Sequence, residues 1–294
     1  MTVTLIKQLQ AFGSTIKISH SIFALPFVGA AILVVPWSVH FRGGSNASRL
    51  IWIIIAALAA RTAAMGFNRI SDAAIDARNP RTANREIPSG KLSIKVAVAL
   101  TLCATLLFEF SAFMLGPPCP VLAPIVMVIL FGYSVTKRFT WLCHFFLGLA
   151  LACGPWGAAV AIGAALPLSA ILLGTGVALW VAGFDILYAC QDADFDAAGG
   201  SCSIPGRFGI QKAFTVARIL HVGAAGFWGV FAFVIGGSWI FILTLTIVAS
   251  LLVAQHKMLR PDDLSKVPIA FFNLNAWVSV VFFLGLFADR FASR

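Results

Sequence analysis

Two stretches of this chain combine carboxylates, amides and basic side chains at helical spacing. In the first, residues 68–91, Asn68, Asp72 and Asp76 are spaced four and four, which places three oxygen-bearing side chains on one helical face. Carboxylate oxygens bind hard divalent metals, and the arginines that follow in this stretch suit phosphate oxygens. The first stretch therefore predicts a site for a metal ion and a phosphate-bearing molecule.

The second stretch, residues 184–209, repeats this arrangement. One helical face is expected to carry four side chains spaced three, four and four: Asp185, Tyr188, Asp192 and Asp196. Asp194 falls off that face. Six of the 11 acidic residues are the aspartates of these two clusters, and this concentration is the main sign of function.

The elements that position these residues are expected to be membrane helices. The chain has 294 residues, of which 60% are hydrophobic and 11% charged, whereas a soluble domain carries about 25% charged residues. We expect an all-α polytopic membrane bundle, a single domain over residues 1–294, with about nine transmembrane helices around a central cavity. The predicted spans are 20–38, 50–70, 96–115, 120–136, 141–163, 168–190, 213–235, 238–256 and 268–288.

The basic residues indicate which side the two stretches face. With nine spans, 16 of the 21 lysines and arginines lie at the N-terminus and in the loops after the second, fourth, sixth and eighth spans, on the side that also carries the two aspartate clusters. The positive-inside rule places these loops in the cytoplasm, which predicts an inner-membrane protein with its site on the cytoplasmic side. This distribution argues against nucleic acid as a partner despite the net charge of +10. The expected partners are the lipid bilayer and small-molecule substrates, with no obligate protein partner.

An internal repeat relates the two stretches. Each follows an apolar run, and the runs lie four spans apart, so both emerge on the same side. The pattern predicts parallel halves of about 1–138 and 139–256 plus a last helix, with the two clusters enclosing one site. The polar segment 77–92 is long for a connection, which favours a functional lid.

Smaller features predict packing. Residues 1–19 are expected to form an amphipathic lead-in. Three glycines of the fifth span are expected to let helices approach closely: Gly148, Gly154 and Gly157. His144 in the same span is expected to be a structural residue.

Two facing pairs of aspartates can hold roughly two Mg²⁺ ions with positions left open for diphosphate oxygens. A diphosphate neutralised in this way becomes a good leaving group, and its departure from an allylic carbon gives a carbocation. An apolar bundle suits an isoprenoid tail, and the 26 Phe and 8 Trp include faces that can stabilise a cation. Most of those aromatic residues are explained by the core and the lipid-facing surface.

These motifs resemble those of the UbiA superfamily of intramembrane aromatic prenyltransferases. Residues 68–76 match its N-x-x-x-D-x-x-x-D motif, and residues 81–85 match R-T-x-x-R. Residues 185–196 match D-x-x-Y-x-x-x-D-x-x-x-D, and residues 133–140, YSVTKRFT, match its Tyr, Lys-Arg and Thr segment. The similarity extends over nearly the whole chain.

The sequence departs from the family pattern at two positions. Arg69 stands where Asp is commoner, and Glu86 stands where Pro is commoner. Neither departure removes an expected metal ligand.

The resemblance implies a nine-span helical fold, Mg²⁺ dependence and transfer of a polyprenyl group from an isoprenyl diphosphate to an aromatic acid in quinone biosynthesis. The expected acceptor is of the 4-hydroxybenzoate type, with a dihydroxynaphthoate of menaquinone synthesis as the alternative. The expected metal ligands are Asn68, Asp72, Asp76, Asp192 and Asp196, the four aspartates being catalytic. The expected substrate-binding residues are Asn68, Arg61, Lys137, Arg138, Arg81, Arg85, Tyr188 and Asp185.

Arg61 precedes Asn68 by two helical turns, which places it ~10 Å deeper on the same face. An arginine there costs about 2.5–3.5 kcal/mol on insertion scales unless it lines a polar cavity or finds a partner. We therefore expect it to hold the carboxylate of the aromatic acid in a bidentate pair. The alternative is a buried ion pair with an acid of another helix, for which Glu109 is the available residue within a span.

Other interpretations fit the clusters less well. A cation transporter would carry acidic groups through the depth of the bundle, whereas here they lie at one face. A CDP-alcohol phosphotransferase has one extended motif, and this chain has two separated ones. A purely structural role, with helix-end carboxylates neutralised by nearby arginines and lysines, is the remaining alternative.

Overall fold

The computed structural model describes residues 5–16, 23–37, 45–163 and 165–292. Within these ranges the regular structure is helical, apart from an isolated bridge between Arg260 and Asp263. Among the described residues, eight helical segments are long and apolar enough to cross a membrane, and they confirm the predicted helical bundle. Their helices are α3 (Asn46–Arg78), α4 (Ile94–Leu115), α5 (Cys119–Thr136), α6 (Cys143–Gly163), α7 (Leu168–Ala189), α10 (Ile210–Val234), α11 (Trp239–Met258) and α13 (Asn275–Ala292).

The first predicted span, 20–38, corresponds to a shorter apolar helix, α2 (Leu25–Val34). Residues 20–22 and 38 of that prediction lie outside the described residues. Helix α2 packs against α6 and α13 and so takes part in the bundle. The number of membrane helices expected from the sequence is therefore close to what the fold contains.

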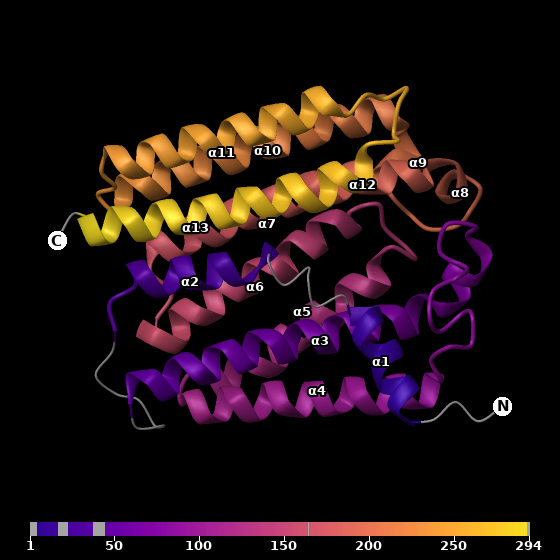
Figure 1. Ribbon diagram of the computed structural model, residues 1–294, viewed down its shortest axis with the longest axis horizontal. Coiled ribbons are helices and arrows are strands. Elements are labelled where there is room, and N and C mark those ends of the chain that lie inside the picture. The colour runs from indigo at the N-terminus through magenta and orange to yellow at the C-terminus, as the bar shows by residue number, and fades with distance from the viewer. Residues whose placement is uncertain (1–4, 17–22, 38–44, 164, 293–294) are drawn as a thin grey trace.

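The long helices run lengthwise through the molecule (Figure 1). Helices α7, α10, α11 and α13 form one group, and α3, α4 and α5 form another (Figure 1). The groups are joined through α6, which contacts both α5 and α7. The segments that follow α3 and α7 lie at the same end of the bundle, on the right in Figure 1. This shared end is what a parallel repeat requires, and the repeat itself stays a prediction.

Helix α3 places the first motif beyond the apolar interior. It begins after Ser45, whose side chain accepts a hydrogen bond from Ser48 N at 3.2 Å, and ends before Asn79 and Pro80. Its 33 residues extend ~50 Å, against ~30 Å of hydrocarbon in a bilayer. Because the helix is continuous from Asn68 to Asp76, the predicted common face is confirmed.

The second motif is not one continuous helix, which corrects the prediction. Helix α7 ends at Ala189, and the chain continues as a 3-10 turn, η2 (Cys190–Asp192), and a short helix, α8 (Ala193–Ala197). Three aspartates within five residues disfavour a helix interior, because their side chains compete for backbone groups. Asp192 and Asp196 therefore do not continue the helical face that carries Asp185 and Tyr188.

The segment between α3 and α4 is folded as a series of turns and is held by α1 (Leu5–Ile16). This helix is the described part of the predicted lead-in, whose residues 1–4 and 17–19 lie outside the described residues. Gln8 Oε1 accepts from Ser93 N at 2.8 Å, and Ser14 Oγ donates to Glu86 Oε1 at 2.7 Å. Burial raises the pKa of Glu86, but hydrogen bonds from Ser14, the backbone and Thr15, together with the charge of Arg69, outweigh burial and the pKa is lowered. The unusual Glu86 thus helps fasten this segment to α1.

Close packing of α6 on α7 depends on Gly148. A Cβ there would lie 2.2 Å from the carbonyl oxygen of Ala178. The prediction of a close approach is therefore confirmed for Gly148, whereas a Cβ at Gly157 would meet no atom within 4 Å. Gly174 and Gly176 of α7 serve the same purpose, since a Cβ at either would collide with a tryptophan ring.

We expect Gly148→Ala to lower the free energy of unfolding by about 1–3 kcal/mol, because the clashing atom belongs to the backbone and cannot rotate away. Thermal unfolding of the purified protein in detergent measures the change. Gly132→Ala in α5 is the control, since its added Cβ would meet no atom within 4 Å. Equal midpoints for the two variants would show that α6 and α7 can separate without cost.

Candidate active site

Asp72 of α3 is 1% exposed and forms an ion pair with Lys137, which follows α5. The Lys137 ammonium donates to Asp72 Oδ2. The other carboxylate oxygen, Oδ1, is buried and accepts no hydrogen bond from the described residues. An orphaned buried acceptor costs free energy, so this oxygen is placed to accept a further ligand.

Asp76, one turn further along α3, is 5% exposed and pairs with Arg85. Arg85 Nη1 lies 2.7 and 2.8 Å from the two carboxylate oxygens. The hydroxyl of Thr82 donates to the main-chain oxygen of Asp76 at 3.1 Å. The segment that follows α3 and carries Thr82 and Arg85 is therefore fastened to the end of that helix at two points.

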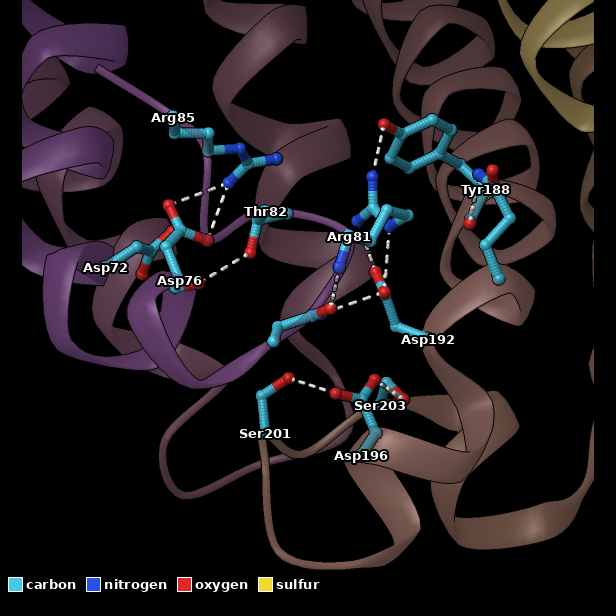
Figure 2. Close-up of polar contacts among 12 residues, drawn as sticks. Asp72, Asp76, Arg81, Thr82, Arg85, Tyr188, Asp192, Asp196, Ser201 and Ser203 are labelled. Atoms are coloured by element: carbon cyan, nitrogen blue, oxygen red, sulfur yellow. Dashed lines mark hydrogen bonds and ion pairs between the residues drawn. The ribbon is translucent and has the colours of Figure 1, made fainter. Parts of the chain in front are cut away.

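Asp192 in η2 receives the side chain of Arg81 in a bidentate pair (Figure 2). Arg81 Nε donates to Asp192 Oδ1 at 2.8 Å, and Arg81 Nη1 donates to the Tyr188 hydroxyl at 3.0 Å. Asn79 Nδ2 adds a third donor to Asp192, at 2.9 Å. Burial lowers the pKa of Arg81, but its bonds to Asp192 and Tyr188 outweigh burial and raise it.

One segment thus reaches both motifs. Figure 2 shows Arg85 extending toward Asp76 on one side and Arg81 extending toward Asp192 on the other. Residues 79–93 therefore bridge the ends of α3 and α7. Two clusters that are far apart in the sequence form one polar site, as the two-stretch pattern predicts.

The remaining motif aspartates, Asp196 and Asp185, are held by two hydroxyls and an imidazole. Asp196 accepts hydrogen bonds from the hydroxyls of Ser201 and Ser203, both at 2.6 Å (Figure 2). Asp185 lies 2.7 Å from Nδ1 of His144. The backbone N–H of Ile204 donates to His144 Nε2 at 3.3 Å, which fixes the imidazole orientation. His144 is a structural partner of a motif residue.

Two further predicted residues have partners near the site. Asn68 Nδ2 donates to Ser134 Oγ at 3.4 Å. Arg138 donates to the main-chain oxygen of Ser71 and to its hydroxyl, the latter at 2.8 Å. Their contacts keep both side chains at the end of α3.

Arg61 is half-buried, and its Nη2 donates to the main-chain oxygen of Ile16 at 3.3 Å. It also interacts electrostatically with Tyr133 of α5, which in turn interacts with Asp72 and Asp185. Glu109 makes no hydrogen bond or ion pair with the described residues. The alternative of an Arg61–Glu109 ion pair is therefore wrong.

The oxygen-rich donor set suits Mg²⁺, although among the described residues no group of three or more His, Cys, Asp or Glu side chains is arranged around one point. Three of the aspartates are engaged by cations instead. The orphaned Oδ1 of buried Asp72 is the observation that fits a metal, because a cation would satisfy it. A metal bound here would have to replace the cations already paired with the aspartates.

Several contributing residues could not be recognised from spacing. They include Asn79, Thr82, Ser201 and Ser203. The Asn79-Pro80 pair was visible as a turn signal, and Ser203 precedes a proline in the pattern of a helix cap; it accepts from Gly206 N at 3.1 Å. Neither signal indicates that these side chains also contact Asp192 and Asp196.

Replacing Lys137 with methionine should lower the free energy of unfolding by about 3–5 kcal/mol, because it leaves Asp72 buried without its cation. Adding Asp72→Asn to Lys137→Met should recover most of that loss, since an amide needs no counter-charge. Denaturation midpoints in detergent measure both effects. Arg138→Met is the control, because Arg138 is exposed and has no carboxylate partner among the described residues. A wild-type midpoint for Lys137→Met would contradict this account of the pair.

Comparisons with known proteins identify the family of the chain. Residues 23–278 match the model of the UbiA prenyltransferase family. The chain is 28% identical over 263 residues to the 4-hydroxybenzoate octaprenyltransferase of Escherichia fergusonii, covering 88% of this chain and 90% of that protein. The corresponding protein of Klebsiella pneumoniae is 29% identical, with coverage of 88% and 91%.

Solved structures show the same fold. A UbiA homologue from Aeropyrum pernix has a TM-score of 0.81 at 31% identity, covering 93% of this chain and 98% of that one. A homologue from Archaeoglobus fulgidus bound to GPP and Mg²⁺ has a TM-score of 0.69 at 16% identity, covering 95% and 99%. This multi-pass membrane protein belongs to the UbiA prenyltransferase family and is a prenyltransferase.

Proposed function

We propose that this chain transfers a polyprenyl group from an isoprenyl diphosphate to an aromatic acid of the 4-hydroxybenzoate type, for quinone biosynthesis. The observation that carries the proposal is the pairing of motif aspartates with three cations suited to phosphate: Lys137, Arg81 and Arg85. The named activity of the curated relatives supports the acceptor, and the GPP-bound homologue supports the donor. A dihydroxynaphthoate is the alternative acceptor.

Asp72, Asp76, Asp192 and Asp196, together with Asn68, would hold Mg²⁺. When bound, the metal supplies a Lewis acid that neutralises charge on the diphosphate. Arg81, Arg85 and Lys137 would donate their N–H groups to phosphate oxygens, in place of the carboxylates they contact now. Tyr188 would help orient Arg81, as its hydroxyl does in the free protein.

The bond between the allylic carbon and the diphosphate oxygen breaks, and its electron pair leaves with the diphosphate. The ring carbon beside the phenolic hydroxyl attacks the allylic cation, and the ring proton passes to a base or water. Aromatic rings next to the site would shield the cation. Phe271 lies 4.4 Å from the Tyr188 ring, and Phe67 stacks on Phe131 at 4.4 Å, beside Asn68.

We assign Arg61 to the carboxylate of the aromatic acid. It lies two turns deeper along α3 than Asn68, and Tyr133, with which it interacts electrostatically, also interacts with Asp72 and Asp185. The site would face the cytoplasm across an inner membrane, because the basic loops lie on the side of the aspartates.

Asn substitutions at Asp72, Asp76, Asp192 or Asp196 should each reduce prenyl transfer below detection while leaving the protein folded, because each removes a negative oxygen required by the metal. Membranes containing the variants are assayed with 4-hydroxybenzoate and with dihydroxynaphthoate, using isoprenyl diphosphates of several lengths. EDTA should abolish wild-type activity, and Mg²⁺ should restore it. Asp194→Asn is the matched control, since Asp194 is exposed and off the motif face. Near-wild-type activity in any two of the four variants would refute the two-cluster site.

Arg61→Leu should raise the KM for the aromatic acid by about tenfold or more, with little change in the KM for the diphosphate, since it removes a charge-assisted pair. Arg61→Lys should rescue the KM only in part, because an ammonium cannot form the bidentate pair. Because Arg61 also donates to Ile16 O, thermal unfolding is measured in parallel to separate binding from stability. An unchanged KM for the acid in Arg61→Leu would remove this residue from the acceptor site.

A further inference from the structure

A pocket of about 300 Å³ opens at the polar end, beside the aspartates but outside the ion pairs described above. One wall is the last turn of α3, with Ile75 and Arg78, and the second is Arg138. The third is the segment from Asp196 to Cys202. This volume lies at the lower end of the range for small-molecule sites.

Two arginines of this pocket differ from the three cations that pair with the motif aspartates. Arg81, Arg85 and Lys137 are each paired with an aspartate. Arg78 and Arg138 are exposed and have no carboxylate partner among the described residues. Both guanidinium groups can therefore bind an anion without first releasing a carboxylate.

The walls of the pocket are held in place. Arg138 is oriented by its bonds to Ser71. The segment from Asp196 to Cys202 is anchored at two points. Cys202 N donates to the main-chain oxygen of Lys137 at 2.6 Å, and the Ser201 hydroxyl donates to Asp196 Oδ1. Gly199 takes a φ of +91°, which few side chains tolerate and which lets the chain turn back here. The two arginines therefore face a built surface.

The charge of the pocket favours an anion. Two guanidinium groups face one carboxylate, that of Asp196, whose oxygens already accept from Ser201 and Ser203. Arginine forks match the oxygens of phosphate, and the open mouth admits a hydrated ligand.

The pocket also adjoins the proposed reaction site. Arg138 follows Lys137 in sequence, Arg78 lies two residues after Asp76, and Asp196 belongs to both sites. An anion released from the aspartates would meet these arginines at the polar surface.

We propose that this pocket is a second phosphoanion site, which adjoins the aspartate site, shares Asp196 with it, and binds phosphate or inorganic diphosphate. This assignment rests on the proposed function: the pocket holds the diphosphate that leaves after prenyl transfer, before that diphosphate is released to solvent. The headgroup of an anionic lipid also carries phosphate oxygens and could occupy the same pocket. The test therefore distinguishes free diphosphate from a lipid headgroup.

The binding test uses the full-length protein in phosphatidylcholine nanodiscs with EDTA, so that its outcome does not depend on metal or on prenyl transfer. Inorganic diphosphate is titrated by calorimetry, and the rate of Cys202 alkylation by iodoacetamide reports occupancy of the pocket. Diphosphate should bind, and it should slow alkylation. Arg78→Gln and Arg138→Gln should each weaken binding by about tenfold, the effect of losing one charge-assisted interaction.

Arg207→Gln is the matched control, because it removes an exposed arginine of the same end that lies outside the pocket. It should bind diphosphate like the wild type, as should Asp72→Asn, which disables the proposed reaction site. Wild-type binding in both pocket variants, or alkylation of Cys202 unaffected by diphosphate, would overturn the proposal.

Nanodiscs containing phosphatidic acid distinguish the sources. Protection of Cys202 by free diphosphate in phosphatidylcholine supports a released anion, whereas protection by phosphatidic acid alone overturns the product assignment in favour of a lipid headgroup. In the active enzyme, Arg78→Gln should raise the inhibition constant of diphosphate by about tenfold. If the inhibition constant is unchanged in Arg78→Gln although the wild-type pocket binds diphosphate, the pocket has no role in diphosphate release. The proposed prenyl transfer would still stand.

Discussion

A carboxylate buried at the end of an apolar bundle has to be neutralised, and this requirement organises the polar end of the protein. Asp72 and Asp76 are almost fully buried, and each receives a cation from outside α3. Asp192 receives Arg81, from the same segment that supplies Arg85 to Asp76. The ion pairs therefore do more than balance charge, because they join the ends of α3 and α7 through residues 79–93.

The same pairs explain how the site can recognise a diphosphate. Guanidinium and ammonium groups that neutralise carboxylates can neutralise phosphate oxygens with the same N–H donors. A ligand must then compensate the aspartates when it takes their cations, which favours a diphosphate that arrives with a metal over an anion alone. Such an exchange makes the binding of metal and diphosphate mutually favourable. Arg78 and Arg138 stand outside this exchange, because neither has an aspartate to release.

Much of this structure could be predicted from the sequence because it depends on local regularities. Apolar runs of membrane length identify helices without tertiary information. The four-residue spacing of Asn68, Asp72 and Asp76 determines their common face, since α3 continues through them. The paired motifs and their similarity to the UbiA superfamily likewise indicated one shared polar site.

Only the tertiary structure decided which side chains meet. Helix α7 ends before Asp192, so spacing alone misplaced the second motif. The hydrogen bonds from Ser203 to Asp196 and from Asn79 to Asp192 depend on how the loops return to the bundle. Arg61 contacts a main-chain oxygen of α1 instead of an acid, and Gly157 has no close neighbour while Gly148 does. Such contacts depend on the relative positions of elements far apart in the chain, which helical periodicity does not encode.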